Sequence, residues 1–410
     1  MTPDAVLATL GTYRETVLAL QKMLVETIAL GPENGGDGER AKADKIKAFM
    51  ASFGASEITE YPSPDPRVSC GHRPNLLTKI EGEDTSRAFW IIAHMDVVPV
   101  GDAALWHTKP FELVVEEDGD TLRGRGVEDN HQGLVSALLL AKALHETGCK
   151  PPINLGLLFV ADEETGNKHG LGFMTQSHPD LFGPDDLYLV PDSGLPDSSQ
   201  IEIAEKSILW IKITVNGKQC HASMPDQGIN SLMAAAAFIV KSNALHQQFD
   251  AKDPLFGKLG STFTPSKIEA NVENVNTISG RDVFYLDCRI LPPYPLDDVI
   301  TAIKAIGTEI EKQHGVTIDY DLVQRVQAPP ATSMDSAIVT RLMKAIEEEC
   351  GTIAQPEGIG GGTVAAYLRR LGLPVAVWST IYHNPHQPNE RASITNTLRD
   401  AKIMARVLFG

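Results

Sequence analysis

Cysteine is scarce in this sequence, and its few cysteines are not paired. The 410 residues include five, Cys70, Cys149, Cys220, Cys288 and Cys350, and no two of them have a Cys-x-x-Cys spacing. An odd number of scattered cysteines predicts neither a disulfide framework nor a thiolate zinc site. We therefore expect a chain that works in the reducing cytoplasm.

Long apolar runs and clusters of basic residues are also lacking. The longest apolar stretch, LMAAAAFIV at 232–240, is far shorter than the roughly 20 residues that a membrane-spanning helix needs. The first residues mix charges into a helical pattern, so we expect no signal peptide or membrane anchor. The net charge of −17, without a basic cluster, argues against nucleic acids and anionic membranes as partners.

Motifs of several enzyme classes are missing as well. The short glycine-rich segments GRGVED and GIGGG have neither the glycine spacing of a dinucleotide-binding loop nor the Lys-Ser/Thr ending of a phosphate-binding loop. No Gly-x-Ser-x-Gly segment is present, so a serine hydrolase would have no obvious nucleophile.

What is present is an ordinary globular composition, with 42% hydrophobic and 22% charged residues. Residues 1–56 predict two helices, and from residue 75 short apolar strands alternate with helices. This alternation is typical of an α/β domain with a mostly parallel, helix-covered sheet. The pattern changes between 206 and 325 to that of a small α+β domain with an open-faced sheet. We therefore expect a discontinuous domain of residues 1–205 and 326–410, with the small domain of residues 206–325 inserted in it.

Acids and imidazoles follow four of the predicted buried strands, at the point where each strand ends. They are His94 and Asp96; Asp162, Glu163 and Glu164; Asp192; and His383 and His386, with Asp129 just before a predicted helix. Because ligands bind at the carboxyl ends of the strands in open parallel sheets, we expect these side chains to converge.

Each of these residues alone has an ordinary explanation. A histidine after a strand usually belongs to the core or the surface, and an acidic triplet usually forms a solvated turn or a helix cap. Together they make a set of oxygen and imidazole ligands without thiolate, which suits zinc, manganese or cobalt. Without metal the carboxylates would crowd a partly desolvated cleft and take up protons, so the sequence favours a site for two divalent ions.

Six segments also resemble a known family. In order they are IIAHMDVVP, LRGRGVEDN, FVADEETG, LVPDSG, QCHASMPDQGINS and HQPNE. They are similar to motifs of the di-zinc amidohydrolases and metallopeptidases that include succinyl-diaminopimelate desuccinylase, acetylornithine deacetylase, aminoacylase and glutamate carboxypeptidase. The resemblance spans residues from about 20 to 405. It implies a zinc-exopeptidase-like catalytic domain, an inserted lid and dimerisation domain, and a homodimer.

The resemblance implies two sets of metal ligands that share one carboxylate. Asp129 would bridge the two metals, with His94 and Asp192 completing one site and Glu164 and His386 the other. Glu163 would be the general base. It would take a proton from a water between the metals and leave a hydroxide there. Asp96 would orient the imidazole of His94 from behind.

In the inserted domain the resemblance implies further contacts. His221 would reach the active site across the dimer and stabilise the oxyanion, and Asn276 and Arg289 would hold the substrate, as would the segment around Gly362. The guanidinium group suits a carboxylate because its donors form a fork. From the residues alone, an ordinary turn residue at His221 and a surface charge at Arg289 would be favoured, and the resemblance reverses that preference.

Two segments depart from the family. Asn130, His131, Gln132 and Gly133 follow Asp129 where many members have Lys-Gly, and Val364 occupies a position that usually carries an acid. The acyl group is therefore left open. We expect a cytoplasmic two-metal hydrolase, with zinc first and cobalt or manganese as alternatives, that cleaves the amide bond of a small N-acyl amino acid, as a desuccinylase or deacetylase does.

Two alternatives remain. One is a dipeptidase or carboxypeptidase on the same scaffold, which would need a carboxylate near the free amino terminus of its substrate. The other is a metal-dependent binding protein without catalysis, and the intact Glu163 argues against it.

Overall fold

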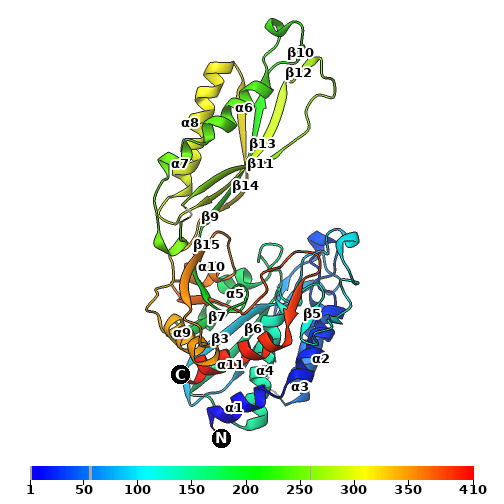
Figure 1. Ribbon diagram of the computed structural model, residues 1–410, viewed down its shortest axis with the longest axis vertical. Helices are drawn as coiled ribbons and strands as arrows, with labels where there is room; N and C mark the ends of the chain where they lie inside the picture. The colour runs from blue at the N-terminus through cyan, green and yellow to red at the C-terminus, as the bar shows by residue number, and fades with distance from the viewer. Residues whose placement is uncertain (1, 55–57, 259) are drawn as a thin grey trace. The chain divides into compact units, whose positions relative to one another are not determined.

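The computed structural model describes three stretches of the chain, residues 2–54, 58–258 and 260–410 (Figure 1). By its internal contacts the chain divides into two compact units. The large unit comprises Met1–Ile203, Ala331–Pro356 and Thr363–Gly410, and the small unit comprises Ala204–Pro330 and Glu357–Gly362.

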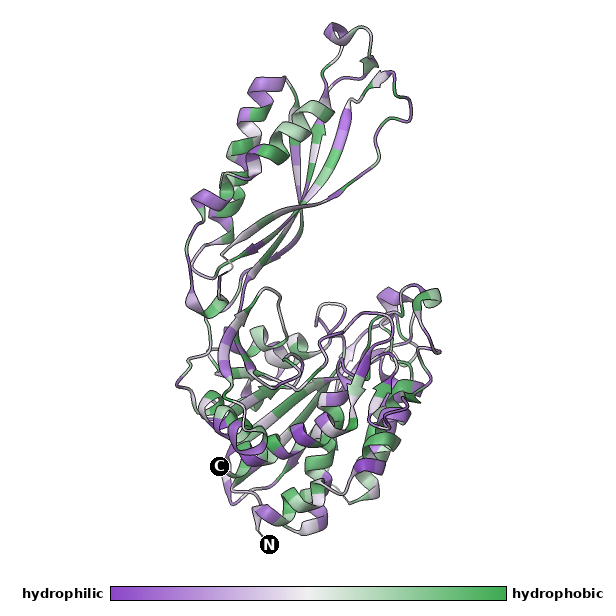
Figure 2. Ribbon diagram, in the orientation of Figure 1, coloured by the Kyte–Doolittle hydropathy of each residue, from purple (hydrophilic) through white to green (hydrophobic). Residues whose placement is uncertain are grey.

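An eight-stranded sheet, in the order β1-β2-β6-β3-β7-β16-β8-β15, is the centre of the large unit. Its strands are β1 (Ile58–Pro64), β2 (His72–Ile80), β3 (Asp84–His94), β6 (Ile153–Val160), β7 (Leu187–Val190), β8 (Gln200–Glu205), β15 (Gln355–Ile359) and β16 (Val375–Val377). The four neighbours β6, β3, β7 and β16 run parallel, and β1 with β2, β2 with β6, and β16 with β8 pair antiparallel. The buried portions of these four parallel strands are apolar runs, which begin at Ala88 in β3, as expected for strands buried on both faces, and green stretches mark such residues in Figure 2.

Helices cover this sheet. They are α1 (Pro3–Leu10), α2 (Arg14–Glu26), α3 (Arg40–Ser52), α4 (His131–Thr147), α5 (Leu171–Ser177), α9 (Ala337–Cys350), α10 (Ala365–Arg370) and α11 (Ile394–Phe409). Helix α4 is apolar nearly all round and is buried among α1, α2, α11 and the strands β3 and β6. A small sheet of β4 (Val114–Val115), β5 (Thr121–Arg123) and β17 (Arg391–Ser393) completes the unit. The predicted α/β class with a mostly parallel, helix-covered central sheet is confirmed.

One predicted helix, over residues 4–28, is two helices in the structure. Helix α1 ends at Leu10 and α2 begins at Arg14, with Gly11 between them. Glycine is a poor helix former, and the hydroxyl of Thr12 donates a hydrogen bond to the carbonyl of Thr9 at 2.7 Å, which competes with helix continuation.

The small unit is a four-stranded antiparallel sheet in the order β11-β13-β9-β14. Its elements are β9 (Ser207–Asn216), β11 (Thr262–Ile268), β13 (Arg281–Ile290), β14 (Thr317–Val326), α6 (Ser231–Ser242), α7 (Leu245–Gln248) and α8 (Leu296–His314), with a two-stranded ribbon of β10 (Cys220–His221) and β12 (Thr277–Ile278). Alternate residues of β9, such as Leu209 and Ile211, pack with Phe238 of α6 and Ile303 of α8. The helices therefore cover one face of the sheet, as Figure 1 shows, and Trp210 lies on the other.

In the three described stretches, no helix combines the length and the apolar character that crossing a membrane requires.

Candidate metal centre

The ends of four neighbouring parallel strands carry the predicted ligands. His94 is the last residue of β3, Glu164 follows β6, Asp192 follows β7, and His386 lies in the segment after β16. Asp129 precedes α4. The structure brings all five together in overlapping groups whose donor atoms lie within 4.8 Å of one another: His94, Asp129 and Asp192; Asp129, Glu164 and His386; and His94, Glu163 and Glu164.

Asp129 faces two imidazoles, one with each oxygen. Its Oδ1 lies 2.9 Å from Nε2 of His94, and its Oδ2 lies 3.1 Å from Nε2 of His386. Nε2 of His94 is also 3.6 Å from Oδ1 of Asp192, and Nε2 of His386 is 3.0 Å from Oε2 of Glu164. The five residues thus form two donor groups with the Asp129 carboxylate between them.

Asp96 fixes the orientation of His94. The backbone carbonyl of Asp96 lies 3.0 Å from Nδ1 of His94, and its Oδ1 lies 3.4 Å from the same atom. Because a carbonyl oxygen can only accept a hydrogen bond, Nδ1 carries the proton and Nε2 faces the centre. Strand β3 ends at His94, so Asp96 lies in the irregular segment that follows the strand.

The same Asp96 carboxylate also holds the acidic turn after β6. It accepts hydrogen bonds from the backbone N–H groups of Glu163 and Glu164, each at 3.0 Å. The preceding Asp162 has a φ of 60°, and its carboxylate accepts the N–H of His169 at 2.9 Å. Asp162 belongs to none of the donor groups found among the described residues, and it serves the turn itself.

Negative charge crowds this site. Burial raises the pKa of Glu163 well above its ordinary value, as do Asp192 and Glu164, and burial together with Asp129 raises the pKa of Glu164 to about 7. Hydrogen bonds to Asp129 and Glu164 raise the pKa of His386 to about 10. The cluster therefore attracts positive charge, whether as protons or as cations.

The residues fit divalent cations. Among the residues that the structure describes, Oε1 of Glu164 is buried and has no hydrogen-bond partner, although its Oε2 faces His386. A buried carboxylate oxygen without a partner is costly unless a cation binds it. Oxygen and imidazole donors without thiolate suit zinc, manganese or cobalt.

His131, at the position that departs from the family pattern, is fully buried. Its Nε2 lies 2.7 Å from Nζ of Lys42, which α3 delivers to this point. Burial lowers the pKa of Lys42 to about 7. This pair was not foreseen from the sequence, because Lys42 is one of several lysines in a helix that looks solvated.

His221 and Asn276 lie together at the tip of the small unit. His221 pairs with Thr277 across the β10–β12 ribbon, and the carbonyl of Asn276 accepts the N–H of Ala222 at 2.8 Å. Nδ1 of His221 accepts the backbone N–H of Ser223 at 3.2 Å and lies 2.8 Å from its hydroxyl. Because a backbone N–H can only donate, Nδ1 is the acceptor and the neutral ring carries its proton on Nε2.

Arg289 is held on several sides in the small unit. Its Nε and Nη2 donate to the carboxylate of Asp287 at 2.7 and 3.1 Å, and its Nη1 donates to the carbonyl of Gly360 at 3.3 Å. The guanidinium carbon lies 5.8 Å from the centre of the Trp210 ring. Arg289 thus contacts the glycine-rich segment that contains Gly362.

The structure does not bring Asn276 and Arg289 together within one chain. Arg281, at the start of β13, lies close in sequence to the tip, and Arg289 comes eight positions later in the same strand. At the usual strand rise this corresponds to about 26 Å. The small unit therefore has two separate groups of predicted substrate residues, His221 with Asn276 and Arg289 with Gly362.

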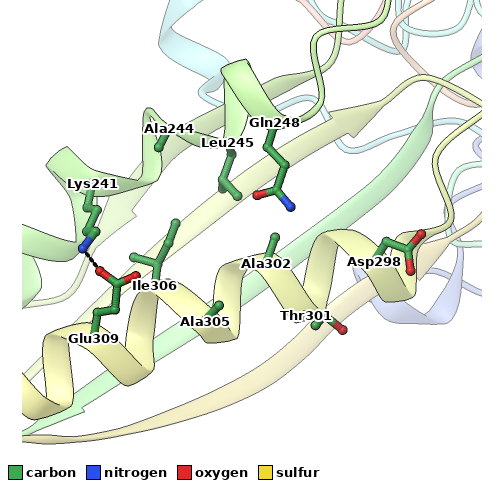
Figure 3. Close-up of a pocket in the computed structure, with 10 residues that line it drawn as sticks. All are labelled: Lys241, Ala244, Leu245, Gln248, Asp298, Thr301, Ala302, Ala305, Ile306 and Glu309. Carbon is green, nitrogen blue, oxygen red and sulfur yellow. Dashed lines mark hydrogen bonds and ion pairs between the residues drawn. The ribbon is translucent and has the colours of Figure 1, made fainter.

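A hollow of about 500 Å³ lies elsewhere in the small unit, between α6–α7 and α8 (Figure 3). Its floor contains small and apolar side chains such as Ala302 and Ile306, and Lys241 and Glu309 pair across one end. None of the described residues that line the hollow is a histidine or a cysteine, in contrast to the strand-end cluster.

Known proteins resemble this chain in sequence and in fold. The sequence profile of peptidase family M20/M25/M40 matches residues 90–409. An uncharacterised metallohydrolase of Methanococcus maripaludis is 37% identical over 416 residues, covering 96% of this chain and 99% of that protein. Succinyl-diaminopimelate desuccinylase of Sulfurovum sp. is 27% identical over 322 residues, covering 78% of this chain and 82% of the enzyme. Human carnosine dipeptidase 1 has the same fold, with a TM-score of 0.75 at 14% identity, covering 100% of this chain and 98% of that chain.

Proposed function

The chain belongs to peptidase family M20/M25/M40, and on that premise we propose that its strand-end cluster is a two-metal centre that hydrolyses the amide bond of a small N-acyl amino acid. One observation carries the proposal: the two oxygens of Asp129 face two different imidazoles at 2.9 and 3.1 Å. That arrangement suits one carboxylate shared between two cations.

In this proposal His94 and Asp192 would hold one metal, Glu164 and His386 would hold the other, and Asp129 would contribute to both sites. Bound zinc, or cobalt or manganese in its place, would polarise the scissile carbonyl and lower the pKa of water at the centre. Asp96 keeps the proton of His94 on Nδ1, which leaves Nε2 free to bind.

Glu163 is the proposed proton carrier. Asp96 fixes its backbone N–H, and burial raises the pKa of its carboxyl group well above the ordinary value. A carboxylate with a raised pKa accepts a proton from water and gives it to the departing amine nitrogen near neutral pH.

The direct test is metal analysis combined with a substrate panel. The purified protein, loaded with Zn²⁺, is assayed with N-acetyl and N-succinyl amino acids and with dipeptides, and bound zinc is counted by atomic spectroscopy. We expect two zinc ions per chain and hydrolysis of an N-acyl amino acid. Two bound ions without turnover of any compound in the panel would favour a binding protein.

A dipeptidase is the second candidate, and Asp287 is the observation that favours it. A free amino terminus needs a carboxylate partner, and Asp287 lies beside Arg289 on the same strand. Asp287→Asn should therefore impair dipeptide hydrolysis more than N-acyl hydrolysis, and an equal loss for both substrates would count against the dipeptidase.

We also propose that the protein acts as a homodimer. If His221 and Arg289 bind the same substrate, one small unit cannot supply both, because about 26 Å of β13 separates the tip from Arg289 and a dipeptide-sized molecule spans about 7 Å. Two copies can supply one residue each. Size-exclusion chromatography with light scattering measures this, and a fully active monomer would refute it.

A cytoplasmic location completes the proposal. Throughout the described residues none of the five cysteines forms a disulfide, which is compatible with a reducing compartment.

A further inference from the structure

The segments that carry Asp129 and His386 have no regular structure of their own. Residues 124–130 form consecutive turns, and residues 378–390 contain neither helix nor strand. His383, His386 and Asn389 have φ values of 63°, 61° and 61°, a conformation that residues with a Cβ rarely adopt. Such backbones persist only where their surroundings hold them in place.

A buried glutamate from the second segment holds the first. Oε1 of Glu390 accepts the backbone N–H groups of Glu128 and Asp129 at 2.9 and 3.1 Å. Its Oε2 accepts the N–H of Gly126 at 3.0 Å and Nη1 of Arg125 at 2.6 Å. Glu390 is fully buried, so these hydrogen bonds do not compete with water.

A buried glutamate from the first segment holds the second in return. Oε2 of Glu128 accepts the N–H of Tyr382 at 2.8 Å, and its Oε1 accepts the N–H of Asn384 at 2.7 Å. These two N–H groups flank His383, three residues before His386. Arg125 adds a link, because its Nη2 donates to the carbonyl of His386 at 3.5 Å.

We propose that Glu128 and Glu390 form a reciprocal brace that fixes the spacing between Asp129 and His386, and thereby sets how tightly the chain binds the metal ion that these two ligands share. Neither glutamate belongs to a donor group around the centre. They are positioning residues that act through the backbones of the two ligand segments. Partners that orient metal ligands in this way typically contribute about 10- to 100-fold to metal affinity.

The two glutamates differ in what they reach. Glu390 binds the N–H of Asp129 itself, and Asp129 belongs to both donor groups, so loss of Glu390 should weaken both metal sites. Glu128 binds only the segment that leads to His386, so its loss should weaken the site of Glu164 and His386 alone. In both residues each carboxylate oxygen accepts a hydrogen bond. In a glutamine one of these oxygens is replaced by an N–H₂ group, which cannot accept a hydrogen bond from an N–H.

The test uses Glu128→Gln and Glu390→Gln, with Asp186→Asn as a matched control. Asp186 is also a buried carboxylate that accepts backbone N–H groups, those of Ala88 at 2.7 Å and Gly183 at 3.1 Å, but it lies at the opposite, amino-terminal end of β3 and β7. Each metal-free protein is titrated with Zn²⁺ by calorimetry, and its thermal unfolding is recorded.

All three substitutions should lower the melting temperature of the metal-free protein. Only the brace variants should lose zinc affinity, by about 10- to 100-fold, at one site for Glu128→Gln and at both for Glu390→Gln. If Glu390→Gln does not fold, Glu128→Gln against Asp186→Asn decides the question alone. Brace variants that bind Zn²⁺ as tightly as the control would overturn the proposal.

This inference rests on the metal ligands proposed above, and the experiment separates the two. A wild-type chain that binds fewer than two Zn²⁺ ions refutes the ligand set and the brace with it. A wild-type chain that binds two, with brace variants that match Asp186→Asn, refutes the brace alone. Neither reading depends on turnover or on the identity of the substrate.

Discussion

The strand-end edge of the large unit and the tip of the small unit hold their functional residues in opposite ways. At the edge, Asp129 is partly buried and its N–H is bound by the buried Glu390, and the acidic turn is bound by Asp96. At the tip, His221 is exposed, and its ring nitrogen is held by its neighbour Ser223. The edge is suited to fixing ions in one geometry, and the tip is suited to donating one hydrogen bond to a partner that arrives from outside.

The largest expected effect tests the edge. Glu163→Gln should lower the hydrolysis rate by about 10² to 10⁴-fold, because general-base catalysis contributes that much. Zinc content should stay at two ions per chain, since Glu164 and not Glu163 is the proposed ligand.

Steady-state kinetics and zinc analysis of the same preparation measure both quantities. If the Glu163→Gln protein binds one zinc ion fewer than the wild type, Glu163 is a metal ligand. Its place in the donor group with His94 and Glu164 is compatible with that outcome. Turnover near the wild-type rate would remove it from the mechanism altogether.

Removal of metal should destabilise the strand-end edge of the large unit and leave the tip of the small unit unchanged. Zinc at a thousand times its dissociation constant stabilises the folded form by about 4 kcal/mol, but only where it binds. Hydrogen exchange of the metal-free protein should therefore speed up in residues 124–130, 161–165 and 382–390 and stay unchanged in β10 and β12. Faster exchange at the tip as well would show that metal binding at the edge also stabilises the tip, which would contradict the expected difference between the two regions.

His221→Ala tests the tip. Loss of one oxyanion donor typically costs about 10² to 10³-fold in kcat. His221→Gln serves as the control, because its amide N–H can reach the place of Nε2, and it should recover part of the rate.

The same variant shows which copy supplies the histidine. His221→Ala mixed with Glu163→Gln should regain about a quarter of wild-type activity, because half of the mixed dimers are heterodimers and each has one complete site. Mixtures that stay as inactive as their components would place His221 and Glu163 of one chain at the same site.

The edge could be predicted from the sequence because its strands are continuous apolar runs that end in acids and imidazoles. The run INLGLLFV before Glu163 and Glu164 became β6, which pairs with β3 in the parallel direction that the alternation of strands and helices implied. Parallel strands end at one edge, so convergence of the five ligands followed from the fold. Their roles at a metal remain predictions.

What was missed has a common cause. Glu128 and Glu390 lie outside helices and strands, and the sequence looks the same whether such an acid is solvated or buried and bound to N–H groups. The resemblance paired Asn276 with Arg289, but eight of the twelve residues between them run along β13 and carry the two apart. Burial and strand direction are tertiary properties, which local residue patterns do not contain.

The smallest effect concerns the proton on His221. Ser223→Ala removes the hydroxyl but keeps the backbone N–H that donates to Nδ1, so the preference for a proton on Nε2 should weaken without vanishing. One exposed hydrogen bond contributes about 0.5–1.5 kcal/mol, which predicts a fall in kcat of roughly tenfold or less.

Ser223→Thr keeps the hydroxyl and should act like the wild type. Nitrogen-15 NMR of the imidazole, assigned against His221→Gln, reports the tautomer directly. A wild-type ring protonated on Nδ1 would mean that His221 points an acceptor outward, and the tip could not then donate to an oxyanion.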